Sequence, residues 1–288
     1  MMPQDVGVID LMIGFPSADA RGKYDSLREL AKDAESQRMN MPAEYMFKEI
    51  PDHLEQQQNP VDVTLAAMDK HGIDIGLVAL RNPITTDAIL RHPNRFAAGL
   101  EVDPNDVSGT VRAIREAHAT HGIVAVSTFP AGCNPQVPVS DRRYYPTYQT
   151  CVDLDIPIIV NAGIAGPRVP SACQDVMHFD QVCYDFPDLR IVMRHGAEPW
   201  EDLAVKLMLK WPGLYYMTSA FAPKYYPRAI IDFANTRGAD KVMYAGYFPM
   251  GLDLDRIFAE LPNVPFRDHV WPAFLRDNAM RVFKLDKR

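Results

Sequence analysis

Eight short apolar runs are spread along the 288-residue chain, and stretches of helical periodicity separate them. Their hydrophobicity is continuous rather than alternating, which is typical of parallel strands buried on both faces. From the second run onward the runs begin roughly 25 to 33 residues apart, the size of one strand–helix unit. The runs lie at 6–12, 73–80, 96–102, 123–129, 156–162, 189–193, 214–220 and 241–248. Eight such units close into a barrel, so the pattern predicts the α/β class and a (β/α)8 TIM barrel.

A doubly wound open sheet is the alternative fold, but no G-x-G-x-x-G motif follows any of the runs. The regular spacing is interrupted only by residues 13–60, which are rich in charge, Met, Tyr and Gln. We expect this insertion after the first strand to form a cap over one end of the barrel. Because no low-complexity linker, internal repeat or second core is evident, we expect residues 1–288 to form a single domain.

Composition limits the partners that such a chain can have. The formal net charge of −7, without any block of basic residues, argues against nucleic-acid binding. No apolar stretch reaches the roughly 18 residues needed to cross a bilayer, and the first residues lack the basic and apolar regions of a signal peptide. These features predict a cytoplasmic protein. Its four cysteines form no C-x-x-C pair and are expected to be reduced and structural, with Cys133 as the one alternative candidate for reactivity.

The carboxyl ends of barrel strands are where active sites form. His195 stands directly behind the run 189–193, in the stretch RHGAEPW. The other strand ends carry few groups that ionise near neutral pH. Polar and sulfur-containing side chains expected at these ends include Asp10, Met12, Arg81, Glu101, Asp103, Asn161, Glu198, Thr218, Ser219 and Tyr247.

Five stretches, taken in order, carry a family resemblance: IDLMIG, RFAAGLEVDPN, IPIIVNAG, RHGAEPW and KVMYAGYFP. They resemble the amidohydrolase superfamily, and within it the amidohydrolase-related branch. That branch includes metal-dependent hydrolases and decarboxylases of the aminocarboxymuconate-semialdehyde and resorcylate types. The resemblance covers the chain apart from 13–60 and implies a barrel whose chemistry lies at the strand ends.

The resemblance also implies a set of metal ligands, most of which are replaced in this chain. Four positions where the family has histidine or aspartate carry Met12, Gly14, Asn161 and Tyr247. Only the histidine of the sixth strand is retained, as His195. A catalytic divalent metal needs at least three protein ligands, so we predict neither a tightly bound metal nor another cofactor. A weak, oxygen-preferring ion held by Asp10, Asn161 and His195 stays open as an alternative.

Without a metal, His195 is the candidate general acid/base. We expect Asp10 to point into the barrel beneath Met12, to fix the tautomer of His195 and to raise the pKa of that imidazole. Asn161 is a candidate donor to an oxyanion, and Tyr247 a candidate proton donor or relay. The alternative is that Asp10 and His195 only hydrogen-bond each other and the backbone inside a filled barrel.

Arginines near the strand ends suggest an anionic substrate. Arg81 and Arg168 are the candidate carboxylate-binding residues. Strand alternation places Arg194 on the side opposite to His195, so we expect it to point outward. The expected substrate-binding residues also include Met12, Thr218 and Glu198.

Aromatic and methionine side chains gather in the insertion, at Tyr45, Met46 and Phe47, and around Lys224. They suit either a lid over the pocket or a surface between subunits, and we expect a homodimer. Two functional classes follow. The first is an enzyme that acts on a small, carboxylate-bearing molecule without the usual divalent metal, by hydrolysis, by carbon–carbon cleavage such as decarboxylation, or by isomerisation. The second is a non-catalytic barrel that binds a ligand or a protein partner.

Overall fold

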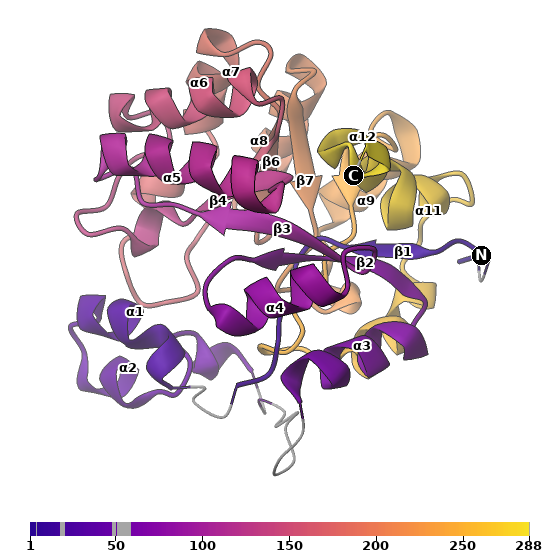
Figure 1. Cartoon of the computed structure of the whole chain (residues 1–288). Coiled ribbons are helices and arrows are strands. Elements are labelled where there is room, and N and C mark those ends of the chain that lie inside the picture. The colour runs from indigo at the N-terminus through magenta and orange to yellow at the C-terminus, as the bar shows by residue number, and fades with distance from the viewer. Residues whose placement is uncertain (4, 18–20, 48–49, 51–58, 288) are drawn as a thin grey trace.

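The computed structural model describes residues 1–3, 5–17, 21–47, 50 and 59–287. Eight parallel strands pair in chain order, each with the next, into one curled sheet with helices on its outside (Figure 1). The strands are β1 Val8–Asp10, β2 Ile73–Ala79, β3 Phe96–Glu101, β4 Ala125–Thr128, β5 Ile158–Asn161, β6 Ile191–Arg194, β7 Leu214–Met217 and β8 Val242–Met243. The predicted (β/α)8 TIM barrel is confirmed.

The helices follow the strands as the sequence pattern predicts. They are α3 Pro60–Lys70, α4 Pro83–Arg91, α5 Val107–His121, α6 Tyr145–Asp153, α7 His178–Asp185, α8 Glu201–Lys210 and α9 Arg228–Thr236. The side chain of Asp106 accepts a hydrogen bond from the Gly109 amide at the start of α5, and Gly122 ends that helix in the left-handed conformation. After β8 the chain continues through α10 Leu254–Glu260, α11 Val270–Pro272 and α12 Asn278–Phe283.

Two layers of apolar side chains enclose the sheet. The inner layer fills the barrel and includes Ile9, Leu77, Ala125, Ile159 and Val192. The outer layer packs between the strands and the surrounding helices. Alternate residues of each strand belong to the two layers, as the two-residue period of a strand requires. This alternation decides which strand-end side chains can reach the barrel interior.

The seam between β1 and β8 is held by two hydrogen bonds that are not part of the regular backbone pairing of the strands. The amide of Gly14 donates to the carbonyl of Phe248 at 2.9 Å. The amide of Gly246 donates to the carboxylate of Asp10 at 2.8 Å. These two bonds continue the sheet around the barrel, so Asp10 connects the first and last strands.

The described part of the predicted insertion contains α1 Asp25–Leu30 and α2 Ala34–Arg38, and Figure 1 shows both beside the barrel rather than in its ring of helices. Within 13–60, positions 18–20, 48–49 and 51–58 lie outside the described residues. No helix in the described part of the chain is long and apolar enough to span a membrane. All four cysteines are buried and unpaired, and burial raises the pKa of the Cys133 thiol to about 12. A thiol of that pKa is a poor nucleophile at neutral pH.

Candidate active site

A cavity of about 390 Å³ opens at the carboxyl ends of the strands. Polar side chains at the strand ends form one part of its lining. They are Glu101 of β3, Asn161 of β5, Arg194 of β6, and Arg81, two residues after the end of β2. The segment that follows β1 forms another part, so residues of the predicted insertion border the pocket. The lining side chains from that segment are Tyr24, Ser26, Leu27, Met41, Pro42, Ala43, Met46 and Phe47.

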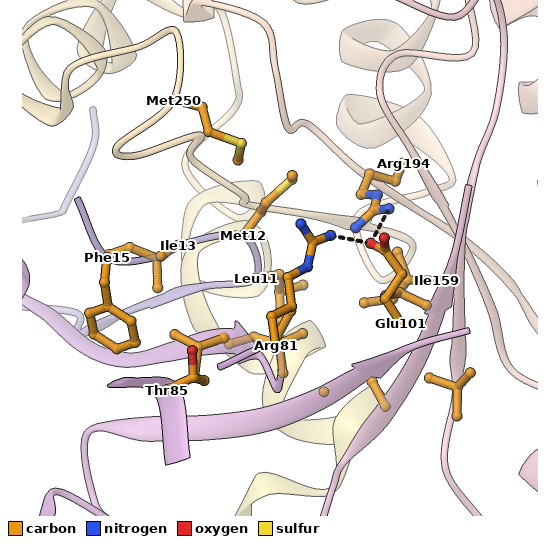
Figure 2. Close-up of a pocket in the computed structure, with 18 of the residues that line it drawn as sticks. Leu11, Met12, Ile13, Phe15, Arg81, Thr85, Glu101, Ile159, Arg194 and Met250 are labelled. Carbon is orange, nitrogen blue, oxygen red and sulfur yellow. Dashed lines mark hydrogen bonds and ion pairs between the residues drawn. The ribbon is translucent and has the colours of Figure 1, made fainter. Parts of the chain in front are cut away.

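Two arginines meet one glutamate in the pocket. The guanidinium of Arg81 donates to the carboxylate of Glu101 at 2.5 Å. An Nη of Arg194 lies 3.9 Å from the same carboxylate oxygen, so one negative charge is shared between two positive ones (Figure 2). Arg194 is nearly fully buried, with a side chain 10% exposed. The cluster carries one net positive charge in a partly desolvated site, where an anion binds more strongly than at an open surface.

The expectation that Arg194 points outward is wrong. Within β6, Val192 belongs to the inner layer and Met193 to the outer one, so Arg194 shares the inner side with Val192. His195 does not continue this alternation, because its backbone is left-handed, with φ of 71°. The turn in the backbone brings the imidazole to the pocket from a position that a regular strand would direct outward. Arg194 and His195 therefore line the same cavity.

Asn161 lies beside Arg194, at the end of the neighbouring strand β5. Its Oδ1 accepts a hydrogen bond of 2.6 Å from Nε of Arg194. This bond fixes the amide so that Nδ2 is the remaining donor, and Nδ2 has no hydrogen-bond partner among the described residues. Asn161 lines the cavity as predicted, with a donor that suits a substrate oxygen.

His195 is held by the strand next to its own. Its Nδ1 lies 3.1 Å from the hydroxyl oxygen of Ser219, just after β7. The ring packs edge to face against Tyr247, with 5.6 Å between ring centroids. Burial, and next the positive charge of Arg194, lower the pKa of His195 well below its ordinary value. The imidazole is therefore neutral at pH 7, the form in which one ring nitrogen can accept a proton.

The predicted pairing of Asp10 with His195 is wrong. Asp10 is fully buried in the seam, where its Oδ1 accepts hydrogen bonds from the amides of Gly246 at 2.8 Å and Met12 at 2.9 Å. Its Oδ2 has no partner among the described residues. Burial outweighs the two amide hydrogen bonds and raises the pKa of Asp10 to about 7. The histidine takes Ser219 as its partner instead, and its pKa is lowered rather than raised.

Strand alternation explains the different place of Asp10. Ile9 and Leu11 belong to the inner layer of the barrel, so Asp10 between them points away from the interior. The sequence-based expectation assigned the opposite alternation to β1, because it took Met12 as the inward-pointing residue. Met12 does line the cavity, but it lies beyond the end of the strand, where the alternation no longer holds.

Tyr247 also lines the cavity, close to both the imidazole and the arginines. Its ring stacks on Phe47 of the inserted segment, with 6.3 Å between centroids and 17° between planes. Burial raises the pKa of Tyr247, an effect that the positive charges of Arg194 and Arg81 oppose. The phenol therefore keeps its proton at neutral pH and can donate it in a hydrogen bond.

Arg168 lies outside the set of side chains that line this pocket. Its guanidinium donates to Glu35 at 2.8 Å and to Asp33 at 3.2 Å, both on the inserted segment. The residue thus connects the loop after β5 to the insertion. Its neighbours Gly166 and Pro167, rather than Arg168 itself, reach the cavity.

Thr218 and Glu198 also lie outside the pocket lining. Thr218 is buried, and its hydroxyl shares hydrogen bonds with the backbone of Ala245, which joins β7 to the chain after β8. Glu198 is exposed and precedes a cis proline, and partial burial raises the pKa of its carboxyl, with a further contribution from Glu201. Both residues occupy structural positions next to the site.

The residues present do not fit the metal centre that the family resemblance implies. Asp10 uses one carboxylate oxygen on two amides and faces away from the cavity, while the amide oxygen of Asn161 is bonded to the cation Arg194. This leaves His195 as the one imidazole of the set, and three ligands are the minimum for a catalytic metal. In the described ranges, no group of three or more His, Cys, Asp or Glu side chains is placed to hold a metal ion.

Sequence reasoning missed Glu101, Arg194 and Ser219 as members of the site. Glu101 and Ser219 were recognised as strand-end residues, but nothing in the sequence indicated their partners. Arg194 had a usable signal. The run IVMR alternates between the two sides of the sheet, and Val192 in the barrel interior places Arg194 there as well.

Eight parallel strands curled into a barrel, with a polar pocket at their carboxyl ends, define this chain as a TIM-barrel protein. The family model for amidohydrolases matches residues 50–285. The chain therefore belongs to the amidohydrolase family, as the sequence resemblance indicated. A comparison with curated proteins gives no match.

Solved structures share the fold at low sequence identity. An uncharacterized TIM-barrel protein from Bordetella bronchiseptica is 21% identical, with a TM-score of 0.76 over 98% of this chain and 100% of that one. The 2,6-dihydroxybenzoate decarboxylase from Rhizobium is 14% identical, with a TM-score of 0.68 over 98% and 99%. The 5-carboxyvanillate decarboxylase from Novosphingobium aromaticivorans is 16% identical, with a TM-score of 0.67 over 98% and 97%, and its structure contains manganese.

Proposed function

We propose that this protein is a metal-independent amidohydrolase-type enzyme that hydrolyses a small organic substrate bearing a carboxylate. The observation that carries this proposal is that the buried Arg194 lines the same cavity as the neutral His195. Its guanidinium is hydrogen-bonded to Asn161 and lies close to the carboxylate of Glu101. A buried guanidinium beside a donor amide is suited to a carboxylate, which it binds with two parallel hydrogen bonds. The cavity of about 390 Å³ suits a molecule with one ring or a short chain.

In this proposal Arg81 and Arg194 anchor the carboxylate, and the neutral imidazole of His195 accepts a proton from the attacking water. The oxygen of that water bonds to the acyl carbon, and the proton passes to the leaving group as the acyl bond breaks. Nδ2 of Asn161 and the phenol of Tyr247 are the donors available to the oxyanion. Burial is the larger cause of the lowered pKa of His195 and persists when substrate binds, while an anion on Arg194 offsets the smaller effect of that positive charge.

Decarboxylation is the second candidate, because two solved structures that share the fold are decarboxylases. Loss of CO₂ moves negative charge out of the carboxylate, and ion pairs to two guanidinium groups oppose that movement. The arginines therefore favour hydrolysis at a neighbouring bond over cleavage of the anchored carboxylate itself. A substrate with two carboxylates, one anchored and one beside His195, is the form in which decarboxylation fits this pocket.

The segment 13–60 is proposed to cap the pocket, since its side chains, among them Phe47 beside Tyr247, border the cavity. The cap and the barrel are proposed to form one domain. A homodimer and a cytoplasmic location stay predictions from the sequence.

The proposal is tested with a panel of carboxylate-bearing esters, amides and aromatic acids, scored for hydrolysis and for CO₂ release. Replacing Arg194 by Gln should lower kcat/KM about 30-fold or more, because a charged hydrogen bond to a desolvated anion is worth about 2 to 5 kcal/mol. Arg228→Gln is the matched control, since that exposed arginine lies outside the pocket lining and pairs with Asp232 on α9, and should change kcat/KM less than about threefold. Binding of such acids without any turnover would identify a non-catalytic barrel instead.

A further inference from the structure

A second, smaller cavity of about 130 Å³ adjoins the first. Arg81, Glu101 and Arg194 line both cavities, so the ion cluster stands at their junction (Figure 2). Strand register places part of the small cavity deeper in the barrel, whereas Phe15, Asn82, Thr85, Pro249 and Met250 line the part beyond the strand ends. Gly99 pairs with Ala125 in the layer that precedes Glu101 and Ser127 along β3 and β4. We call this deeper cavity the inner chamber.

The inner chamber exists because small residues replace bulky ones on neighbouring strands. In barrels of this fold the interior is filled by layers of large branched side chains. Here β2, β3 and β4 contribute Ala79, Gly99 and Ala125 to one side of the chamber, while Leu11 and Ile159 form other parts of its wall. Missing side-chain volume on three adjacent strands leaves a hollow beneath the charged cluster.

The wall of the chamber offers few free polar groups. Asn82 and Thr85 line it, but their side chains bond to each other and to the backbone at the start of α4. Apart from the charged junction, the hydroxyl of Ser127 and the amide Nδ2 of Asn82 are the polar side-chain groups of the lining without a hydrogen-bond partner among the described residues. A chamber of this kind favours an apolar group over water.

We propose that the inner chamber is a subsite for a short apolar substituent attached next to the carboxylate that Arg81 and Arg194 bind. This inference rests on the proposed carboxylate anchor and adds the substrate class: acids that carry a small alkyl group on the anchored side. The size follows from the volume, since an apolar cavity of roughly 150 Å³ accommodates benzene and this one is slightly smaller. The reacting bond then points the other way, into the larger cavity with His195.

The test measures dissociation constants of acetate, propionate, butyrate and isobutyrate by ligand-observed NMR titration. Each methylene group buried in the chamber should tighten binding about fourfold, the factor that corresponds to roughly 0.8 kcal/mol per methylene. The variant Gly99→Val should remove this gain but keep acetate binding. A β-carbon at Gly99 would lie 3.6 Å from both the carbonyl oxygen of Ala125 and the Leu77 side chain, an ordinary contact, so we expect the variant to fold.

Ala113→Val, at an exposed position on α5, is the matched control and should leave all four constants unchanged. If each methylene still increased the affinity in Gly99→Val, the alkyl group would have to lie in the larger cavity, and the proposal would be overturned. Benzene, which has no carboxylate, tests the apolar subsite separately from the carboxylate-binding arginines. If no acid binds the wild-type protein but benzene binds and is excluded by Gly99→Val, the anchor fails while the chamber stands. If benzene does not bind the wild-type protein either, the subsite is refuted.

Discussion

Asp10 and His195 should give this protein two opposing pH dependences of stability. Asp10 has a pKa of about 7 in the folded protein and an ordinary value of 3.8, so between these values the folded state binds the extra proton. Stability therefore falls as pH rises, by about 1.4 kcal/mol per pH unit well below pH 7 and by about 2 kcal/mol in all from pH 5 to pH 7. Above pH 7 this contribution levels off.

His195 acts in the other direction. Its pKa is lowered well below the ordinary value of 6.5, so below pH 6.5 the unfolded state binds the extra proton. Stability contributed by the neutral imidazole is present above pH 6.5 and is lost as pH falls below that value. The two slopes have opposite signs in the wild-type protein between pH 5 and pH 6.5.

Single variants should separate the two slopes. Asp10→Asn keeps an oxygen for the amides of Gly246 and Met12, and its stability should rise from pH 5 to pH 6.5. His195→Gln should lose stability from pH 5 to pH 7. The measurement is urea unfolding followed by circular dichroism at pH 5, 6, 7 and 8, with Asp62→Asn, an exposed carboxylate on α3, as the control.

The reasoning would be refuted if Asp10→Asn kept the pH profile of the wild-type protein. It would equally be refuted if stability attributable to Asp10 rose between pH 5 and pH 7. Either result would mean that the seam holds an ionised carboxylate at low pH, with the amide hydrogen bonds outweighing burial.

Three further predictions follow from single contacts. Gly99→Ala should stabilise the fold by about 0.5 to 1 kcal/mol, measured as an increase in Tm, because a strand glycine is replaced where a β-carbon fits; a decrease would mean that the barrel interior is tighter than the structure indicates. Asn161→Asp should lower kcat/KM at least about tenfold, because the new carboxylate would pair with Arg194, while the midpoint of urea unfolding should stay unchanged. An unchanged kcat/KM would show that Arg194 does not bind the substrate. Cys133 should resist iodoacetamide at pH 8 in the folded protein, as read by mass spectrometry, since burial raises its pKa to about 12; rapid labelling would contradict that burial.

The barrel was predictable from the sequence because its signal is repeated eight times along the chain. Each apolar run is long enough to show burial on both faces, and an error at one run would not change the count. The strand-end location of the site follows from the fold alone, which is why Met12, Arg81, Asn161, His195 and Tyr247 were placed in the pocket.

The contacts within the site were less predictable, since each depends on the orientation of a single residue. Val192 and Met193 define an alternation that brings Arg194 inward, but the left-handed backbone of His195 reverses it one residue later. A histidine in that conformation has no distinct sequence signal. The ion pair of Arg81 with Glu101 joins residues 20 positions apart, so only the three-dimensional register of β2 and β3 reveals it.

The central claim is that guanidinium and imidazole groups, rather than a bound metal, carry the chemistry of this pocket. The most direct measurement is metal content by mass spectrometry on protein purified without added metal or a histidine tag, and again after incubation with zinc and with manganese followed by desalting. We predict well below one equivalent of metal per chain in every sample, from protein that remains folded. One equivalent of zinc or manganese that is retained by the wild-type protein and lost in His195→Gln would contradict the claim. It would indicate a metal-dependent hydrolase instead.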